Sequence, residues 1–87
     1  MEKYPRRCDA TGKGIWEGYV VGYGELYFSE EKHLIDHLRS RGGMDGLSDE
    51  FILKESYEQD EYFYTEWNKY DIDDVYYDED GNEYEKQ

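Results

Sequence analysis

The chain has 87 residues, enough for one domain with a modest core, and its formal net charge is −13. A charge of that sign excludes direct binding to nucleic acid or to an anionic membrane, because both require a basic surface. Only 37% of residues are hydrophobic, but 18% are aromatic. Since aromatic side chains bury large areas, we expect one folded domain over residues 1–87 rather than a disordered chain.

The predicted elements begin after a polar N-terminal loop. Residues 1–14 are punctuated by glycine, and we expect them to form this loop and to be frayed. A strand is predicted over residues 16–21 and a second over residues 25–28. The turn Gly22-Tyr23-Gly24 lies between them, so the two strands are expected to form a hairpin.

Two helices are predicted in the middle of the chain. For the first, Ser29 is the expected N-cap and Gly42-Gly43 the stop signal. Its apolar stripe consists of Leu34, Ile35 and Leu38. The second helix is expected to begin near Ser48 and to extend towards Tyr57.

The C-terminal half is predicted to be mainly strand. Alternation over residues 62–67 places Phe63, Thr65 and Trp67 on one face, and Tyr62, Tyr64 and Glu66 on the other. Residues 75–77 and 83–85 are expected to pair as a hairpin around Asp80-Gly81, with residues 86–87 as a frayed tail. The resulting prediction is an α+β fold: a small, mainly antiparallel sheet of about five strands with two helices.

Charge is distributed unevenly along the sequence. Residues 1–43 hold seven Lys or Arg and seven Asp or Glu, whereas residues 44–87 hold three Lys and sixteen acids. The second half therefore carries the whole net charge, which favours an electrostatic role towards a basic partner.

The acidic and aromatic run near the C-terminus is the predicted contact surface. Alternate residues of a strand are about 6.7 Å apart, so the carboxylate pairs Asp71/Asp73, Asp78/Asp80 and Glu83/Glu85 are expected to imitate a row of phosphates. Tyrosines between them are expected to act as rigid anchors, as tyrosine does at interfaces. The predicted partner-binding residues are Asp71, Asp73, Asp74, Tyr76, Tyr77, Asp78, Glu79, Asp80 and Glu83.

Metal binding is the weaker interpretation. With Gly81 as the invariant glycine of a calcium loop, the first and last ligand positions fall on Tyr76 and Gln87, so that motif fails. A zinc site built from Cys8, His33 and His37 remains as an alternative, because the two histidines are four residues apart on the first helix. Otherwise we expect no cofactor and no catalytic residues, since no nucleophile lies in a recognisable catalytic pattern.

The segments Cys8-Asp-Ala-Thr-Gly-Lys-Gly, Glu17-Gly-Tyr-Val-Val, Gly24-Glu-Leu-Tyr-Phe and Asp60-Glu-Tyr-Phe-Tyr-Thr-Glu-Trp67 resemble those of short acidic proteins, uncharacterised in function, from Bacteroidota and their mobile elements. By composition alone, the chain is also similar to phage anti-CRISPR and anti-restriction inhibitors. Many of those inhibitors occupy nucleic-acid channels. Neither resemblance implies particular site residues.

These observations predict a non-catalytic acidic inhibitor that docks on the basic surface of a nucleic-acid-binding enzyme. One alternative is a small metal-binding or regulatory module. Another is a structural adaptor that self-associates through the aromatic strand at residues 62–67. The single cysteine and the polar start Met-Glu-Lys-Tyr-Pro-Arg-Arg, which does not resemble a signal peptide, favour a cytoplasmic location.

Overall fold

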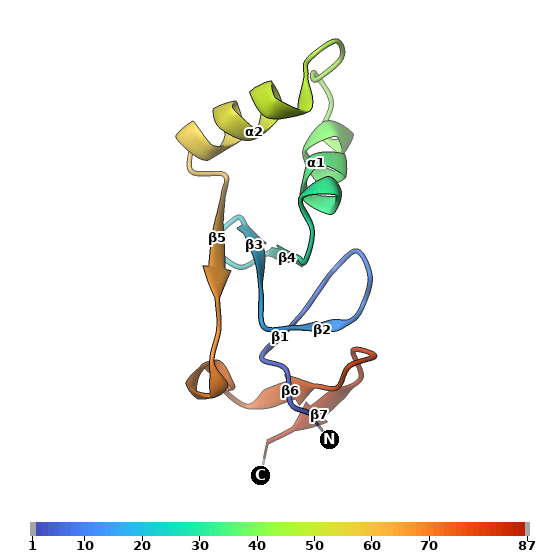
Figure 1. Ribbon diagram of the computed structural model, residues 1–87, viewed down its shortest axis with the longest axis vertical. Helices are drawn as coiled ribbons and strands as arrows, with labels where there is room; N and C mark the ends of the chain where they lie inside the picture. The colour runs from blue at the N-terminus through green and yellow to red at the C-terminus, as the bar shows by residue number, and fades with distance from the viewer. Residues whose placement is uncertain (1, 87) are drawn as a thin grey trace.

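The computed structural model describes residues 2–86 and has an α+β fold. The molecule is elongated, with extents of 48 × 21 × 15 Å. Two helices lie at one end, a short hairpin and both termini lie at the other, and a three-stranded sheet lies between them (Figure 1). No helix among the described residues is long and apolar enough to span a membrane.

The central sheet contains β3 (Glu17–Val21), β4 (Leu26–Phe28) and β5 (Tyr62–Glu66), all antiparallel, in the order β4-β3-β5. The predicted hairpin is confirmed, because β3 and β4 pair in register across the glycine turn. Tyr19 of β3 lies opposite Tyr64 of β5, so the sheet joins residues 45 positions apart in the chain.

Both predicted helices are present. Helix α1 spans Glu31–Ser40 and helix α2 spans Asp49–Glu58. The expected N-cap of α2 is confirmed, since the Ser48 hydroxyl accepts a hydrogen bond from the Phe51 N–H at 3.2 Å. The expected N-cap of α1 is wrong: Glu30 occupies that position without a side-chain cap, and the Ser29 hydroxyl instead donates to Cys8 Sγ at 3.5 Å.

The predicted N-terminal loop contains structure that the sequence did not indicate. Strand β1 (Arg6–Arg7) pairs with β2 (Gly14–Ile15), and Cys8 between them is fully buried. Tyr4 forms two backbone hydrogen bonds with Tyr77, at 2.8 and 2.9 Å. The N-terminal segment is therefore attached to the C-terminal part of the chain.

The sheet is divided into three pieces where a single one was expected. All five predicted strands form, but β6 (Val75–Tyr77) and β7 (Glu83–Glu85) make a separate hairpin. The 3-10 turn η1 (Lys69–Asp71) separates this hairpin from β5. A capping box at Asn68 fixes the turn, so the chain leaves the direction of β5 before β6 begins.

The main core lies between the central sheet, the two helices and the loop that contains Cys8. Leu34 and Leu38 of α1 and Ile52 of α2 are at most 1% exposed and form its centre. This confirms the predicted apolar stripe of α1 as a core-facing surface. Tyr62, the first residue of β5, packs against the same cluster, so this core joins α1, α2 and β5.

Candidate functional site

The predicted contact residues extend from η1 to the start of β7. They lie near the end of the molecule that also holds the termini (Figure 1). Asp71 belongs to η1, and Asp78 and Asp80 belong to the β6–β7 turn, so these residues are not in strands. The expectation that strand pairs at Asp71/Asp73 and Asp78/Asp80 form carboxylate rows is therefore wrong. Only Glu83 and Glu85 share a strand, β7.

Three of the predicted carboxylates are bound within the fold. Asp71 Oδ2 accepts from the Asn68 N–H at 2.8 Å and completes the capping box of η1. Glu83 accepts a long hydrogen bond, 3.5 Å, from the Tyr77 hydroxyl.

Asp78 has the most internal partners. Its Oδ1 accepts from the backbone N–H groups of Asp80 and Asn82, both at 2.9 Å. Its Oδ2 accepts from the Asn82 side chain and the Tyr84 hydroxyl, both at 3.0 Å. Because its oxygens are used in this way, Asp78 organises the β6–β7 turn instead of facing a partner.

The two predicted tyrosine anchors are covered by cations from the N-terminal segment. Lys3 Nζ lies 4.9 Å from the centre of the Tyr76 ring, and the Arg7 guanidinium carbon lies 5.0 Å from the centre of the Tyr77 ring. Tyr76 also stacks with Tyr84, at a centroid distance of 5.4 Å. Their rings therefore stabilise the attachment of the N-terminal segment to the hairpin.

Four of the predicted residues remain available to a partner. The side chains of Asp73, Asp74, Glu79 and Asp80 are exposed and make no hydrogen bond or ion pair within residues 2–86. They occupy the loop before β6 and the turn after it, and they form the exposed part of the predicted surface.

The negative charge is distributed differently in the folded protein than along the sequence. The part that contains the termini, residues 2–16 and 67–86, combines six Lys or Arg with ten acids and has a net charge of −4. The central sheet and helices, residues 17–66, combine four Lys or Arg with thirteen acids and have a net charge of −9. The basic N-terminal residues pack beside the acidic hairpin and offset part of its charge. The larger net negative charge therefore lies on the central sheet and helices together.

Few carboxylates are neutralised by ion pairs. Of the 23 Asp and Glu residues, all within the described part of the chain, only Glu30, Asp49 and Glu61 form salt bridges. The partners are Lys32 and His33 for Glu30, Arg39 for Asp49, and Arg41 for Glu61. The remaining twenty acids are left with no basic side chain in ion-pair contact.

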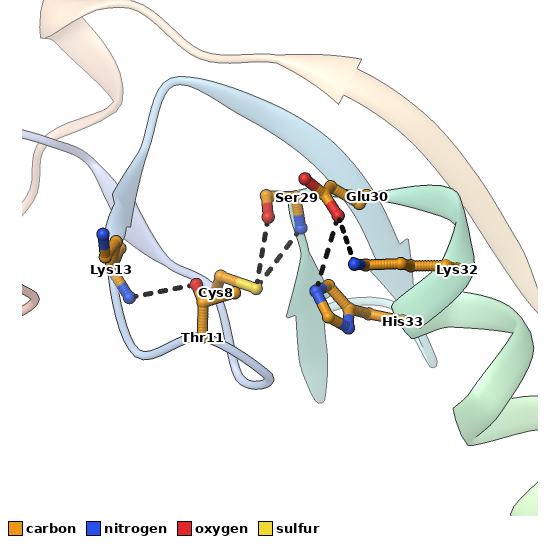
Figure 2. A network of polar contacts seen from close by, with 7 residues as sticks. All are labelled: Cys8, Thr11, Lys13, Ser29, Glu30, Lys32 and His33. Atoms are coloured by element: carbon orange, nitrogen blue, oxygen red, sulfur yellow. Dashed lines mark hydrogen bonds and ion pairs between the residues drawn. The ribbon is translucent and has the colours of Figure 1, made fainter.

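The alternative zinc site does not form. Within residues 2–86, no three His, Cys, Asp or Glu side chains are grouped so that they could hold a metal ion. Figure 2 shows Cys8 Sγ facing Ser29, while His33 turns towards Glu30. His37 packs against the ring of Phe28, with a centroid distance of 5.6 Å.

Cys8 is instead a hydrogen-bond acceptor in the core. Its sulfur accepts from the Ser29 N–H at 3.4 Å, in addition to the hydroxyl contact described above. Burial by itself would raise the pKa of the Cys8 thiol, but hydrogen bonds from Ser29 and Thr11 outweigh it, so that pKa lies below its ordinary value. This residue therefore fixes the N-terminal segment against the start of α1.

A second surface, outside the predicted contact set, lies on the central sheet and α2, and it includes part of the aromatic strand that was the alternative self-association surface. Four tyrosine rings follow one another edge to face, and we call them the tyrosine strip. They are Tyr57 of α2, Tyr62 and Tyr64 of β5, and Tyr19 of β3. Strand alternation placed Tyr62 and Tyr64 on one face, but the contribution of Tyr19 depends on the register between β3 and β5.

The role of Asp78 gives a pH-dependent prediction. Hydrogen bonds from Asn82 stabilise its ionised form, so the pKa of Asp78 lies below its ordinary value. Its contribution to folding is complete above the ordinary pKa of about 4, and it is lost as the pH falls through the lower folded-state pKa. We expect Asp78→Asn to lower the melting temperature at neutral pH and to reduce the further loss below about pH 4.

Thermal unfolding followed by circular dichroism from neutral pH to about pH 2 checks this expectation. Asp80→Asn is the matched control, because it removes an exposed carboxylate from the same turn without removing a hydrogen bond of its side chain. Equal pH profiles for the two variants would show that Asp78 has no special role in the turn.

No family model, curated protein or solved structure matches this chain.

Proposed function

We propose that this chain is a non-catalytic acidic inhibitor that docks on the basic surface of a nucleic-acid-binding enzyme, in the manner of anti-CRISPR or anti-restriction proteins. The observation that carries the proposal is the excess of carboxylates without an ion-pair partner, twenty of 23, over a molecule 48 Å long. Self-repulsion among such charges destabilises a compact fold, and a basic partner relieves that repulsion on binding.

The proposed contact surface is the exposed part of the predicted set, Asp73, Asp74, Glu79 and Asp80. Charges at the rim of an interface mainly raise the association rate and make it dependent on salt. The proposal therefore requires inhibition that weakens as ionic strength rises.

Charge reversal tests this surface. We expect replacement of Asp73, Asp74, Glu79 and Asp80 by Lys to weaken inhibition by about tenfold or more, because attraction to the enzyme becomes repulsion. The measurement is the cleavage of labelled DNA by a panel of purified RNA-guided nucleases and restriction enzymes, titrated with wild type and variant at low and moderate salt.

A second variant separates this surface from net charge alone. It reverses four exposed acids elsewhere, Glu25, Asp36, Asp45 and Glu50, and has the same net charge. We expect this control to retain more inhibition than the first variant. Undiminished inhibition by a folded first variant would contradict the proposal, and so would the absence of inhibition by wild type across the panel.

A further inference from the structure

The tyrosine strip is an aromatic surface whose two outer rings are exposed. Successive ring centroids from Tyr57 through Tyr62 and Tyr19 to Tyr64 are 5.8, 6.0 and 5.0 Å apart. Tyr57 is 61% exposed and Tyr64 is 50% exposed. The Tyr62 hydroxyl donates to the Leu53 carbonyl of α2 at 3.1 Å, which holds the middle of the strip in place. A rigid, partly exposed row of rings is a suitable contact surface for another protein.

The opposite part of the molecule shows which groups such rings accept in this chain. Three cations of the N-terminal segment lie over aromatic rings of the β6–β7 hairpin, of β4 and of the segment after β5. They are Lys3 over Tyr76, Arg7 over Tyr77, and Arg6 over both Tyr27 and Trp67, at 5.7 and 5.5 Å. No Lys or Arg within residues 2–86 lies over a ring of the tyrosine strip. The tyrosine strip is thus a similar row of aromatic rings, but no cation of the described residues covers it.

Carboxylates border the strip. Glu17 and Glu66 are direct partners across β3 and β5, and alternation places them on the same face as Tyr19 and Tyr64. Like charges directly opposite in a sheet are destabilising, and neither glutamate forms an ion pair within the described residues. Interaction of its hydroxyl with Glu17 raises the pKa of Tyr64, in agreement with the placement of both residues on one face of the sheet.

The first turn of α1 contributes another carboxylate. Burial raises the pKa of Tyr19, and Glu31 next to its hydroxyl raises that pKa further. Acidic groups therefore flank the strip from two directions, from the ends of β3 and β5 and from α1. A cation over these rings meets both an aromatic face and a carboxylate.

We propose that the tyrosine strip and its bordering glutamates bind arginine side chains of an extended basic segment on the partner protein. This inference rests on the proposed function and identifies the contact chemistry. Arginine suits the surface better than lysine, because its planar guanidinium stacks on a ring and forms two parallel hydrogen bonds with a carboxylate. Alternate side chains of an extended segment are about 6.7 Å apart, close to the ring spacing of the strip.

Two peptides of equal charge test the inference on the intact chain. One alternates arginine with serine and the other alternates lysine with serine, with four basic residues in each. Calorimetric titration at about 0.15 M salt reduces the contribution of distant charges. We expect wild type to bind the arginine peptide about three- to tenfold more tightly, because arginine adds ring stacking and paired hydrogen bonds with a carboxylate that lysine does not make.

Substitutions at Tyr64 test whether the preference for the arginine peptide arises at the tyrosine strip. Tyr64→Leu should reduce the ratio between the two peptides to below about twofold, while Tyr64→Phe should retain it, because the contact needs the ring and not the hydroxyl. Tyr70→Leu is the matched control, since Tyr70 is 81% exposed and lies outside the strip. Circular dichroism of each variant establishes that it is folded.

The glutamate pair gives an independent readout. Glu66→Gln and Asp73→Asn each remove one negative charge, but only the first lies beside the strip. We expect Glu66→Gln to weaken arginine-peptide binding more than Asp73→Asn does, and to raise the melting temperature of the free protein by relieving the repulsion from Glu17.

Several results would overturn the inference. Equal affinity of wild type for the two peptides would do so, as would an equal effect of Tyr64→Leu and Tyr70→Leu. A dimer in light scattering that Tyr64→Leu converts to a monomer would mean that a second copy of the chain covers the strip. If charge reversal at the hairpin abolishes nuclease inhibition while Tyr64→Leu inhibits like wild type, this inference fails and the proposed function stands.

Discussion

Replacing Gly81 by alanine is expected to destabilise the protein by about 3–5 kcal/mol, close to the upper range for single substitutions. Gly81 is buried in the β6–β7 turn with a φ of +87°, and a Cβ at this position would lie 1.5 Å from the Gly12 carbonyl oxygen. The carbonyl oxygen and carbon of Gly12 belong to the backbone, so no side-chain rotation relieves the overlap. The hairpin must therefore move away from the loop between β1 and β2.

A matched glycine separates this clash from the cost of the left-handed conformation. Gly46 has a φ of +80°, and a Cβ there meets no atom within 4 Å. Gly46→Ala should cost only about 1–2 kcal/mol, the penalty of a left-handed residue. Urea denaturation of both variants at neutral pH measures the difference. Equal losses would show that the close approach of Gly81 and Gly12 does not hold the two loops together.

Truncation of the core at Leu38 should have an effect of similar size. The Leu38 side chain is fully buried at the centre of the core between α1, α2 and the sheet. Leu38→Ala is expected to cost about 2–5 kcal/mol, from lost burial and the cavity left behind. A chain of this length has a total stability of about 4–13 kcal/mol, so the variant is expected to be partly unfolded at 37 °C.

Leu53→Ala provides the comparison. Leu53 lies in α2 and is only partly buried against the same core, so both variants exchange leucine for alanine within a helix. Because leucine and alanine have similar helix propensities, the difference between the variants reports burial and not helix formation. The free energy of unfolding in urea is expected to fall at least twice as much for Leu38→Ala. Equal changes would mean that the core is not centred on α1.

The proposed site shows the limit of charge counting along a sequence. The acids near the C-terminus were readily identified, but Asp71 and Asp78 serve capping and turn formation, which their side chains achieve with neighbouring backbone groups. Tyr76 and Tyr77 are covered by residues from the other end of the chain. A composition argument treats all such residues alike, whereas the structure leaves only part of the set exposed.

Local patterns by themselves determined the elements of this protein. Apolar periodicity and the glycine stop define α1, the Ser48 cap defines the start of α2, and short β-rich runs with glycine turns define five strands. These signals depend on neighbouring residues, so they are readable before the chain is folded. The total charge and its excess in the second half of the sequence are equally independent of the fold.

Only the tertiary structure decided how these elements meet. The division of the strands into three small sheets was visible only in the folded chain. The pairing of Tyr4 with Tyr77 and the contact of Gly81 with Gly12 join residues more than sixty positions apart. The tyrosine strip likewise depends on the register of β5 against β3 and on the packing of α2. Such contacts form because several buried surfaces must be satisfied at once, and no local pattern in the sequence encodes that balance.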